Sequence, residues 1–423
     1  MKAIVPILVL LLSVTLPVHA EQFGLFTYDM SDGEITITDF PADLTDAVVV
    51  PDEIAGLPVT GIGEGAFSRS RAVGIALPPG ITSIGSEAFH SCDSLTEIEL
   101  PPALTTVGRS AFEGCSSLVS IKIPSGVTSL GGNVFRNCTS LVDASLPEGL
   151  STIGVFTFAN CVALENVHLR EGFTRLNRGM FFGCSSLASI EIPSTIVTIG
   201  TVAFRDCNSL AEIALPASLA RIEYGAFLGC SSLESIDLPD GLETIDRLGF
   251  SGCSALATIE IPPLVGRIGD FAFQSCTSLT EVRFAGGIQS IGSGSFESCS
   301  SLQAIVFPSG LISIGARAFR SCGSLSMLSL PVGLESIGDG AFGACVALQE
   351  VAIPISVTAV GGGAFFECTG LERLILPEGL TTLGTGANAF QGCSSLIEVT
   401  IPSSVLSIGR GNFQDCAALT RVS

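Results

Sequence analysis

Cysteine recurs at a fixed interval through most of this 423-residue chain. Its fifteen cysteines run from Cys92 to Cys416, and successive ones are 23 residues apart except for a single step of 25. A phenylalanine lies three residues before every cysteine, and Phe67 extends this ladder by one unit toward the N-terminus. A period of this length is typical of repeat architectures, in which each repeat is one structural unit stacked on the next.

Each repeat contains two short apolar segments. The end of Leu118–Ile123 alternates apolar and polar residues, which predicts a half-buried strand, and Pro124 ends that strand because it cannot donate to a ladder. Val127–Leu130 supplies a second apolar pair, and Gly131 predicts a turn with positive φ. Only one helical turn fits before the next cysteine.

One such unit cannot bury its own apolar side, whereas stacked units bury a continuous column. Adjacent strands lie about 4.8 Å apart, so fifteen or so coils would form a rod or arc roughly 70 Å long. No linker or shift in composition interrupts the repeats. We therefore predict one tandem-repeat domain over residues 67–423.

The repeat pattern reads Cys-x-x-Leu-x-x-Ile-x-Leu/Ile-Pro-x-x-Leu/Val-x-x-Ile-Gly-x-x-Ala-Phe from about Val48 to Ser423. It resembles the BspA-type leucine-rich repeat of bacterial and some protist surface proteins. Phe26–Ile37 with Pro58–Phe67 resembles the usual N-terminal cap of that family, which implies a hairpin-like cap and first repeat entry over residues 21–66. The resemblance implies an α/β, mainly β, right-handed solenoid with a parallel sheet on its concave face and short strands, turns and one-turn helices opposite. It also implies an exported adhesin that binds proteins, without naming the ligand.

The N-terminus has the pattern of a secretory signal. Lys2 precedes the largely apolar Ala3–Leu16, and Val18-His19-Ala20 fits a cleavage site, so we predict a signal peptide at residues 1–20 and a secreted or cell-surface protein. A membrane anchor is the alternative, although the run is short for a bilayer span. No later apolar run is long enough to cross a membrane.

The net charge of −21, from 19 basic and 40 acidic residues, argues against nucleic acid or an anionic membrane as the partner.

The cysteines have two interpretations. An exported chain rich in cysteine can carry a disulfide framework. Here the count is odd, there is one cysteine per repeat, and stacked residues have parallel Cβ vectors that suit a disulfide badly. We therefore expect a ladder of buried free thiols that pack as small apolar groups. No CxxC pair indicates a metal site.

Catalytic residues do not gather in the pattern. His90 and His168 lie three repeats apart, roughly 15 Å at the strand spacing, which is too far to act together. The glycines follow the repeat period rather than forming a phosphate-binding loop before a helix. We expect no enzyme activity and no cofactor.

The outward positions of the first strand, five and seven residues after each cysteine, are the best candidates for binding. They are mainly acidic and polar up to about residue 283, and apolar side chains then appear between two arginines. Such patches often mark partner sites, and scattered variation on a weakly constrained surface is the alternative. The predicted partner-binding residues are Arg283, Ala304, Val306, Met327, Glu350, Ala352, Arg373 and Ile375.

Two further possibilities remain open. A second outward row, just before each Ile-Gly, is mostly Ser and Thr and is interrupted by Arg175, Arg221 and Arg267; a flat row of this kind can bind ice or a glycan lattice. The chain also stops within a repeat at Leu419–Ser423. An open strand edge there would allow self-association and a structural or matrix role, unless the sequence is truncated.

Overall fold

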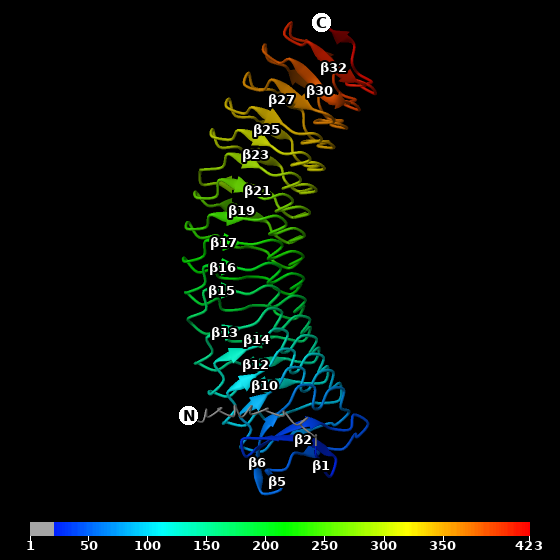
Figure 1. Ribbon diagram of the computed structural model, residues 1–423. Helices are drawn as coiled ribbons and strands as arrows, with labels where there is room; N and C mark the ends of the chain where they lie inside the picture. The colour runs from blue at the N-terminus through cyan, green and yellow to red at the C-terminus, as the bar shows by residue number, and fades with distance from the viewer. Residues whose placement is uncertain (1–20) are drawn as a thin grey trace, which may run out of the picture.

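A computed structural model describes residues 21–423 as one curved rod of stacked coils (Figure 1). The predicted signal peptide, residues 1–20, lies outside the described residues. The described chain consists of short strands joined by turns and contains no helix. The expected one-turn helices are therefore wrong: the segment before each cysteine forms tight turns, such as the one in which Cys138 N–H donates to the Phe135 carbonyl at 3.2 Å.

Two rows of strands run along the rod. The first row comes from the segment that ends, in most repeats, at a proline such as Pro124. Its strands are β4 (Val48–Val49), β7 (Ile75–Ala76), β10 (Ser120–Lys122), β12 (Asp143–Ser145), β14 (Asn166–Val167), β19 (Thr258–Ile261), β21 (Glu281–Phe284), β23 (Ala304–Val306), β25 (Met327–Ser329), β27 (Glu350–Ala352), β29 (Arg373–Ile375), β31 (Glu398–Val399) and β33 (Arg421–Val422).

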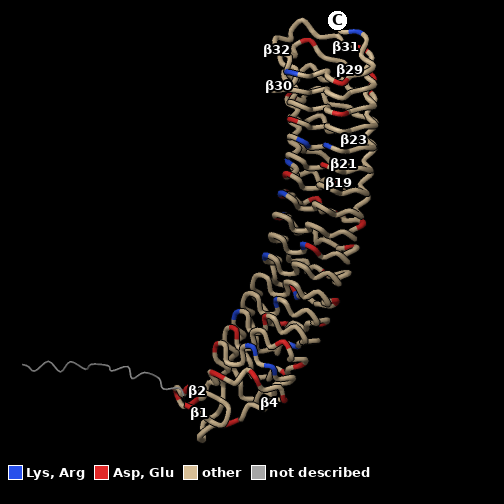
Figure 2. The backbone as a smooth tube through the Cα atoms, turned by 90° about the vertical axis from the view of Figure 1, so that its right-hand side faces the viewer, with Lys and Arg blue, Asp and Glu red and all other residues tan. Residues whose placement is uncertain are grey.

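The second row comes from the short segment before the Ile-Gly of each repeat. Its strands are β8 (Ser83–Ile84), β9 (Thr106–Val107), β11 (Ser129–Leu130), β13 (Thr152–Ile153), β15 (Arg175–Leu176), β16 (Thr198–Ile199), β17 (Arg221–Ile222), β18 (Thr244–Ile245), β20 (Arg267–Ile268), β22 (Ser290–Ile291), β24 (Ser313–Ile314), β26 (Ser336–Ile337), β28 (Ala359–Gly361), β30 (Thr382–Ala387) and β32 (Ser407–Arg410). Figure 2 shows β19, β21 and β23 on one margin of the tube and β30 and β32 on the opposite margin.

An antiparallel cap begins the second row. The strands β1 (Glu21–Phe23), β2 (Phe26–Ser31) and β3 (Glu34–Asp39) pair antiparallel in sequence order. The next strand, β6 (Leu57–Ile62), pairs parallel with β3 and antiparallel with β5 (Glu53–Ile54), and then continues parallel into β8. The Phe40 ring lies 5.1 Å from that of Phe67, so the cap covers the end of the apolar interior. This is what a terminal repeat must do to keep the stack soluble.

The second row forms the more continuous sheets. It makes one sheet from β1 to β13 and an 11-stranded sheet from β15 to β32, whereas the first row is divided into sheets of two to four strands. Pairing is parallel with a shift of one repeat, as in Arg221↔Thr244 and Ile222↔Ile245. Because the register equals the repeat period, residues at one repeat position form a column along the rod.

The phenylalanine column is the clearest of these. From Phe67 to Phe413 each ring stacks on the next, with centroids 5.1–5.8 Å apart and interplanar angles of 2–16°. The spacing between ring centroids follows from the separation of adjacent strands, about 4.8 Å, because each ring packs along the rod only against the rings of the coils before and after it. The predicted interior column is confirmed.

The cysteines form a parallel column of free thiols. Fourteen are buried and Cys416 is partly exposed. Each thiol donates to a phenylalanine carbonyl of the previous coil, as from Cys230 Sγ to the Phe204 oxygen at 3.0 Å. Burial raises the pKa of Cys138 and of Cys230 to about 12, because a thiolate there would lose its hydration. The expectation of buried thiols acting as small apolar groups is therefore confirmed.

The glycine of each Ile-Gly has a different role from the one predicted. Gly131 does not have a positive φ; the left-handed residues of that coil are Asn133 (φ 60°) and Asn137 (φ 61°). A Cβ at Gly131 would lie 2.7 Å from the backbone nitrogen of Arg109 in the previous coil, and one at Gly154 would overlap the Gly131 backbone. Glycine is needed here because two coils approach closely, and the turn itself lies further along the repeat.

We predict that Gly154→Ala destabilises the protein by about 1–3 kcal/mol, because the added methyl forces neighbouring backbones apart. Urea denaturation followed by circular dichroism measures the change. The matched control is Gly266→Ala, since nothing lies within 4 Å of a Cβ at that glycine and its φ is not positive. Equal destabilisation by both changes would contradict this account of close coil contact.

We also predict that iodoacetamide at pH 8 modifies Cys416 first in the folded protein and the other cysteines only after unfolding. Cys416 is the only cysteine among the described residues that is not fully buried. Peptide mass spectrometry of alkylated protein gives the order of labelling. Uniform labelling of the native protein, or finding seven disulfides, would contradict the buried thiol column.

Candidate functional site

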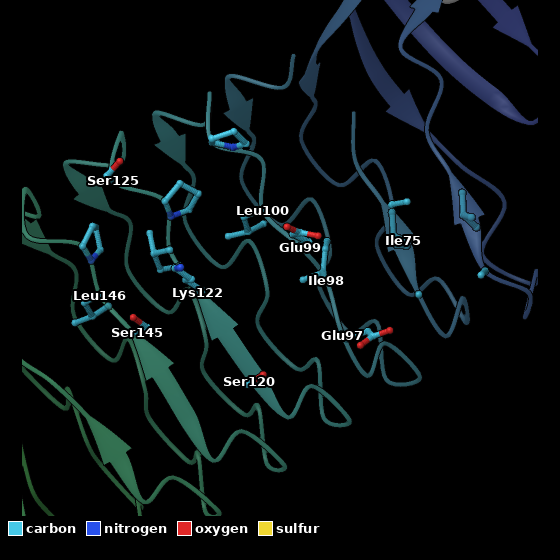
Figure 3. Close-up of a pocket in the computed structure, with 18 of the residues that line it drawn as sticks. Ile75, Glu97, Ile98, Glu99, Leu100, Ser120, Lys122, Ser125, Ser145 and Leu146 are labelled. Atoms are coloured by element: carbon cyan, nitrogen blue, oxygen red, sulfur yellow. The ribbon is translucent and has the colours of Figure 1, made fainter. Parts of the chain in front are cut away.

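The first row of strands carries a groove at its N-terminal end. The groove has a volume of about 1110 Å³ and is lined by β4, β7, β10, β12 and the segment Glu97–Leu100 that lies between β7 and β10. Figure 3 shows this segment with Ile75 on one side and Lys122 on the other. The ladder is open here: Glu97 makes a single bridge to Gly74, and β10 pairs only with β12.

The groove has an apolar floor and charged sides. Leu100, Ile123 and Leu146 are among its lining residues and are themselves almost fully buried. Glu97 and Glu99 lie on the segment between β7 and β10, and Lys122 lies on β10 beside them (Figure 3). An elongated ligand could therefore contact apolar surface and charge of both signs. The sequence identified these charged positions as outward-facing, but the groove depends on the interrupted ladder and could not be predicted.

Far along the same row, the predicted apolar patch is exposed. Val306 is 78% exposed, Met327 is 66% exposed and Ile375 is 41% exposed. The strands β23, β25, β27 and β29 hold all the predicted residues except Arg283, which lies on β21, and they pair as Ala304↔Met327 and Ala352↔Ile375.

Other exposed apolar residues in these coils were not predicted, and Val332 and Ile355 are the most exposed of them. Val332 is 78% exposed and Ile355 is 68% exposed, and each directly follows the proline that ends a first-row strand. Other repeats place polar residues such as Ser125 or Glu148 at this position. This difference between apolar and polar residues after the proline is the sequence signal that could have identified Val332 and Ile355.

The flanking arginines are already paired. Arg283 contacts Glu281 on its own strand through two hydrogen bonds of 2.7 and 2.8 Å. The guanidinium holds the pKa of Glu281 below its ordinary value. Arg373 lies 3.8 Å from Glu350 on the adjacent strand. Both ion pairs are exposed, so they contribute little to stability, and they leave the apolar side chains as the unusual feature of this region.

Residues 21–423 show neither a metal-binding cluster nor a membrane-spanning helix. No group of His, Cys, Asp or Glu in that range is arranged to hold a metal ion. None of these residues forms a helix that is long and apolar enough to cross a membrane. Neither observation bears on the predicted signal peptide, which precedes this range.

The registered columns and the parallel sheets identify a leucine-rich-repeat solenoid. Residues 60–188, 175–303 and 289–420 match the family described as BspA type leucine-rich repeat region (6 copies). The chain belongs to the BspA-type leucine-rich repeat family. No curated protein matches the sequence.

Solved structures of other leucine-rich repeat proteins are similar to this member of the family. A leucine-rich repeat protein from Bacteroides ovatus has a TM-score of 0.72 at 25% identity, with 96% of this chain and 100% of that chain covered. A leucine-rich repeat protein from Eubacterium ventriosum gives a TM-score of 0.49 at 24% identity, over 81% of this chain and 93% of the other. A leucine-rich cell surface protein from Faecalibacterium prausnitzii gives 0.42 at 21% identity, over 96% and 94%.

Proposed function

We propose that this BspA-type protein is an exported, non-enzymatic scaffold that binds other proteins through its first row of strands, as an adhesin does. The family and the solenoid fold support a binding role, because a stack of coils offers a long surface to a partner. The cell surface is the proposed location, and the predicted signal peptide would deliver the protein there.

The observation that carries the proposal is the exposed apolar side chains of the coils from β23 to β29. Val306, Met327 and Val332 are each at least 66% exposed on a chain whose net charge is −21. Contiguous apolar surface is unusual on a soluble protein, and the centres of protein interfaces are depleted in charge and enriched in side chains such as Met. Burying these side chains against a partner would supply the affinity.

The groove beside Glu97–Leu100 provides a second contact region on the same row. A partner that extends along the first row would reach both regions, and binding at two sites raises overall affinity without any new contact. This distribution suits a large protein ligand better than a small molecule.

The second row of Ser and Thr supports an ice- or glycan-binding function less well than the first row supports protein binding. Thr152 donates to Ser129 at 2.8 Å within the row, so part of its hydrogen-bonding capacity is already used. Arg175, Arg221 and Arg267 are exposed and interrupt the row at every second coil.

Self-assembly in a structural or matrix role is the alternative function. Sedimentation at several protein concentrations tests this alternative, because a monomer at every concentration would exclude self-assembly.

We predict that Val306→Asp with Met327→Asp weakens binding to a protein ligand at least about tenfold, which corresponds to 1.4 kcal/mol. Removing the two new carboxylates from water in the interface would cost binding free energy. The fold should stay intact, because both side chains point outward. Purified extracellular-matrix and cell-surface proteins immobilised on a biosensor give the affinities, and circular dichroism checks the fold.

The control for this test is Val73→Asp with Leu264→Asp. These residues are also exposed and apolar but lie in other coils. The proposal fails if the Val306/Met327 variant binds as tightly as the unchanged protein, or if the control variant loses as much affinity.

A further inference from the structure

Three successive turns on the side of the second row contain no acidic residue. They span residues 131–138, 154–161 and 177–184 and carry Arg136 and Arg178. Lys and Arg recur along the margin of the tube that carries β30 and β32 (Figure 2). In a chain with 40 acidic and only 19 basic residues, this local composition is unusual.

The two arginines sandwich an aromatic ring. The guanidinium of Arg136 lies 5.9 Å from the centre of the Phe156 ring, and that of Arg178 lies 5.6 Å from it. In the next coils Arg205 lies 5.4 Å from the Phe182 ring. We call Arg136, Phe156, Arg178, Phe182 and Arg205 the arginine–aromatic surface.

The backbone is adapted to hold this arrangement. Phe156 has a φ of 55°, a conformation that costs energy for a bulky residue, and its ring occupies the space where a side chain at residue 179 would lie. Residue 179 is glycine, so the ring can lean over the next coil and reach Arg178. The Phe156 ring therefore lies against the next coil and provides a platform for the guanidinium groups of Arg136 and Arg178.

The charge of these arginines is only partly neutralised. Over residues 21–423, Arg178 makes no ion pair, and the one carboxylate near Arg136 is that of Glu113 at 3.9 Å. The Arg136 side chain is 43% exposed. Arg205 contacts Asp206 at 3.2 Å, at the edge of the surface. N–H donors on the guanidinium groups of Arg136 and Arg178 are thus free for an anionic ligand.

We propose that the arginine–aromatic surface binds an acidic polysaccharide. A stacked guanidinium keeps its fork of N–H donors pointing outward, where it pairs with a carboxylate or sulfate through two hydrogen bonds. The partly exposed edges of Phe156 and Phe182 offer apolar surface to the sugar rings. Arg136 and Arg178 lie two coils apart, roughly 10 Å at the strand spacing, on the scale of one disaccharide.

This site is independent of the proposed protein-binding function, because it lies on the turns after the second row and away from β23–β29. Nucleic acid fits less well. Its affinity comes from neutralising many phosphates along a duplex, whereas the surface offers three arginines on a protein of strongly negative net charge.

The test measures binding of the folded protein to polygalacturonate, to dextran sulfate and to neutral dextran, with single-stranded DNA as a further polyanion. We expect binding to polygalacturonate, dextran sulfate or both, and none to neutral dextran; the two acidic polymers distinguish carboxylate from sulfate recognition. Arg136→Gln with Arg178→Gln should weaken this binding at least about tenfold, and added salt should weaken it in the unchanged protein.

The matched control is Arg317→Gln with Arg320→Gln, which removes two arginines from a turn whose neighbouring coils carry Glu297 and Asp339. This control should leave the affinity within about twofold of the unchanged protein, a difference of only ~0.4 kcal/mol. The proposal is wrong if no acidic polysaccharide binds, if both double variants lose affinity equally, or if DNA binds as tightly as the polysaccharide. Circular dichroism of each variant checks that the fold is retained.

Discussion

The in-register parallel stacking of identical coils is the constraint on which the rest of this structure depends. A 23-residue coil has too little interior to bury its own apolar side chains, so each one is covered only by the coils before and after it. The strand pairing fixes the spacing at about 4.8 Å, and every inward side chain must then stack on a copy of itself. A uniform column of phenylalanine satisfies this condition because planar rings stack at nearly that distance.

The same constraint explains the cysteine column and the Ile-Gly glycines. A thiol is small enough to repeat at every coil, and it donates a hydrogen bond to the Phe carbonyl of the previous coil, which also accepts one from the backbone N–H of the cysteine in its own coil. Glycine is required where the backbones of adjacent coils come closest, as between Gly131 and Gly154. Where Glu223 takes the glycine's place, its carboxylate accepts hydrogen bonds from the Thr201 backbone and hydroxyl in the previous coil.

The sequence predicted what is periodic and missed what depends on contact between coils. The phenylalanine and cysteine columns follow from spacing alone, and the position of the first strand follows from its alternation and its closing proline. The positive φ was assigned to Gly131 because glycine usually signals it, although Asn137 before Cys138 carried the correct signal. The continuity of the second row, the groove at Glu97 and the ring of Phe156 between two arginines all arise from neighbouring coils, and no local pattern specifies them.

Because the interior columns are nearly invariant, variation is confined to outward positions. Val306 on the first row and Arg178 on the turns can therefore differ from other repeats without disturbing the stack. This separation would allow one chain to carry both of the binding surfaces that we propose, the apolar region on the first row and the arginine–aromatic surface on the turns. The interior columns thus stabilise the fold, and the outward positions are left to vary.

Deletion of one whole coil tests this account most directly. Removing residues 230–252 joins Gly229 to Cys253 and keeps every column in register, whereas removing residues 230–240 shifts all later positions. Urea denaturation should show that the 23-residue deletion retains the circular dichroism and cooperative unfolding of the full chain, and that the 11-residue deletion loses both. If the whole-coil deletion fails to fold, or if both deletions behave alike, stacking of equivalent coils is not what holds the protein together.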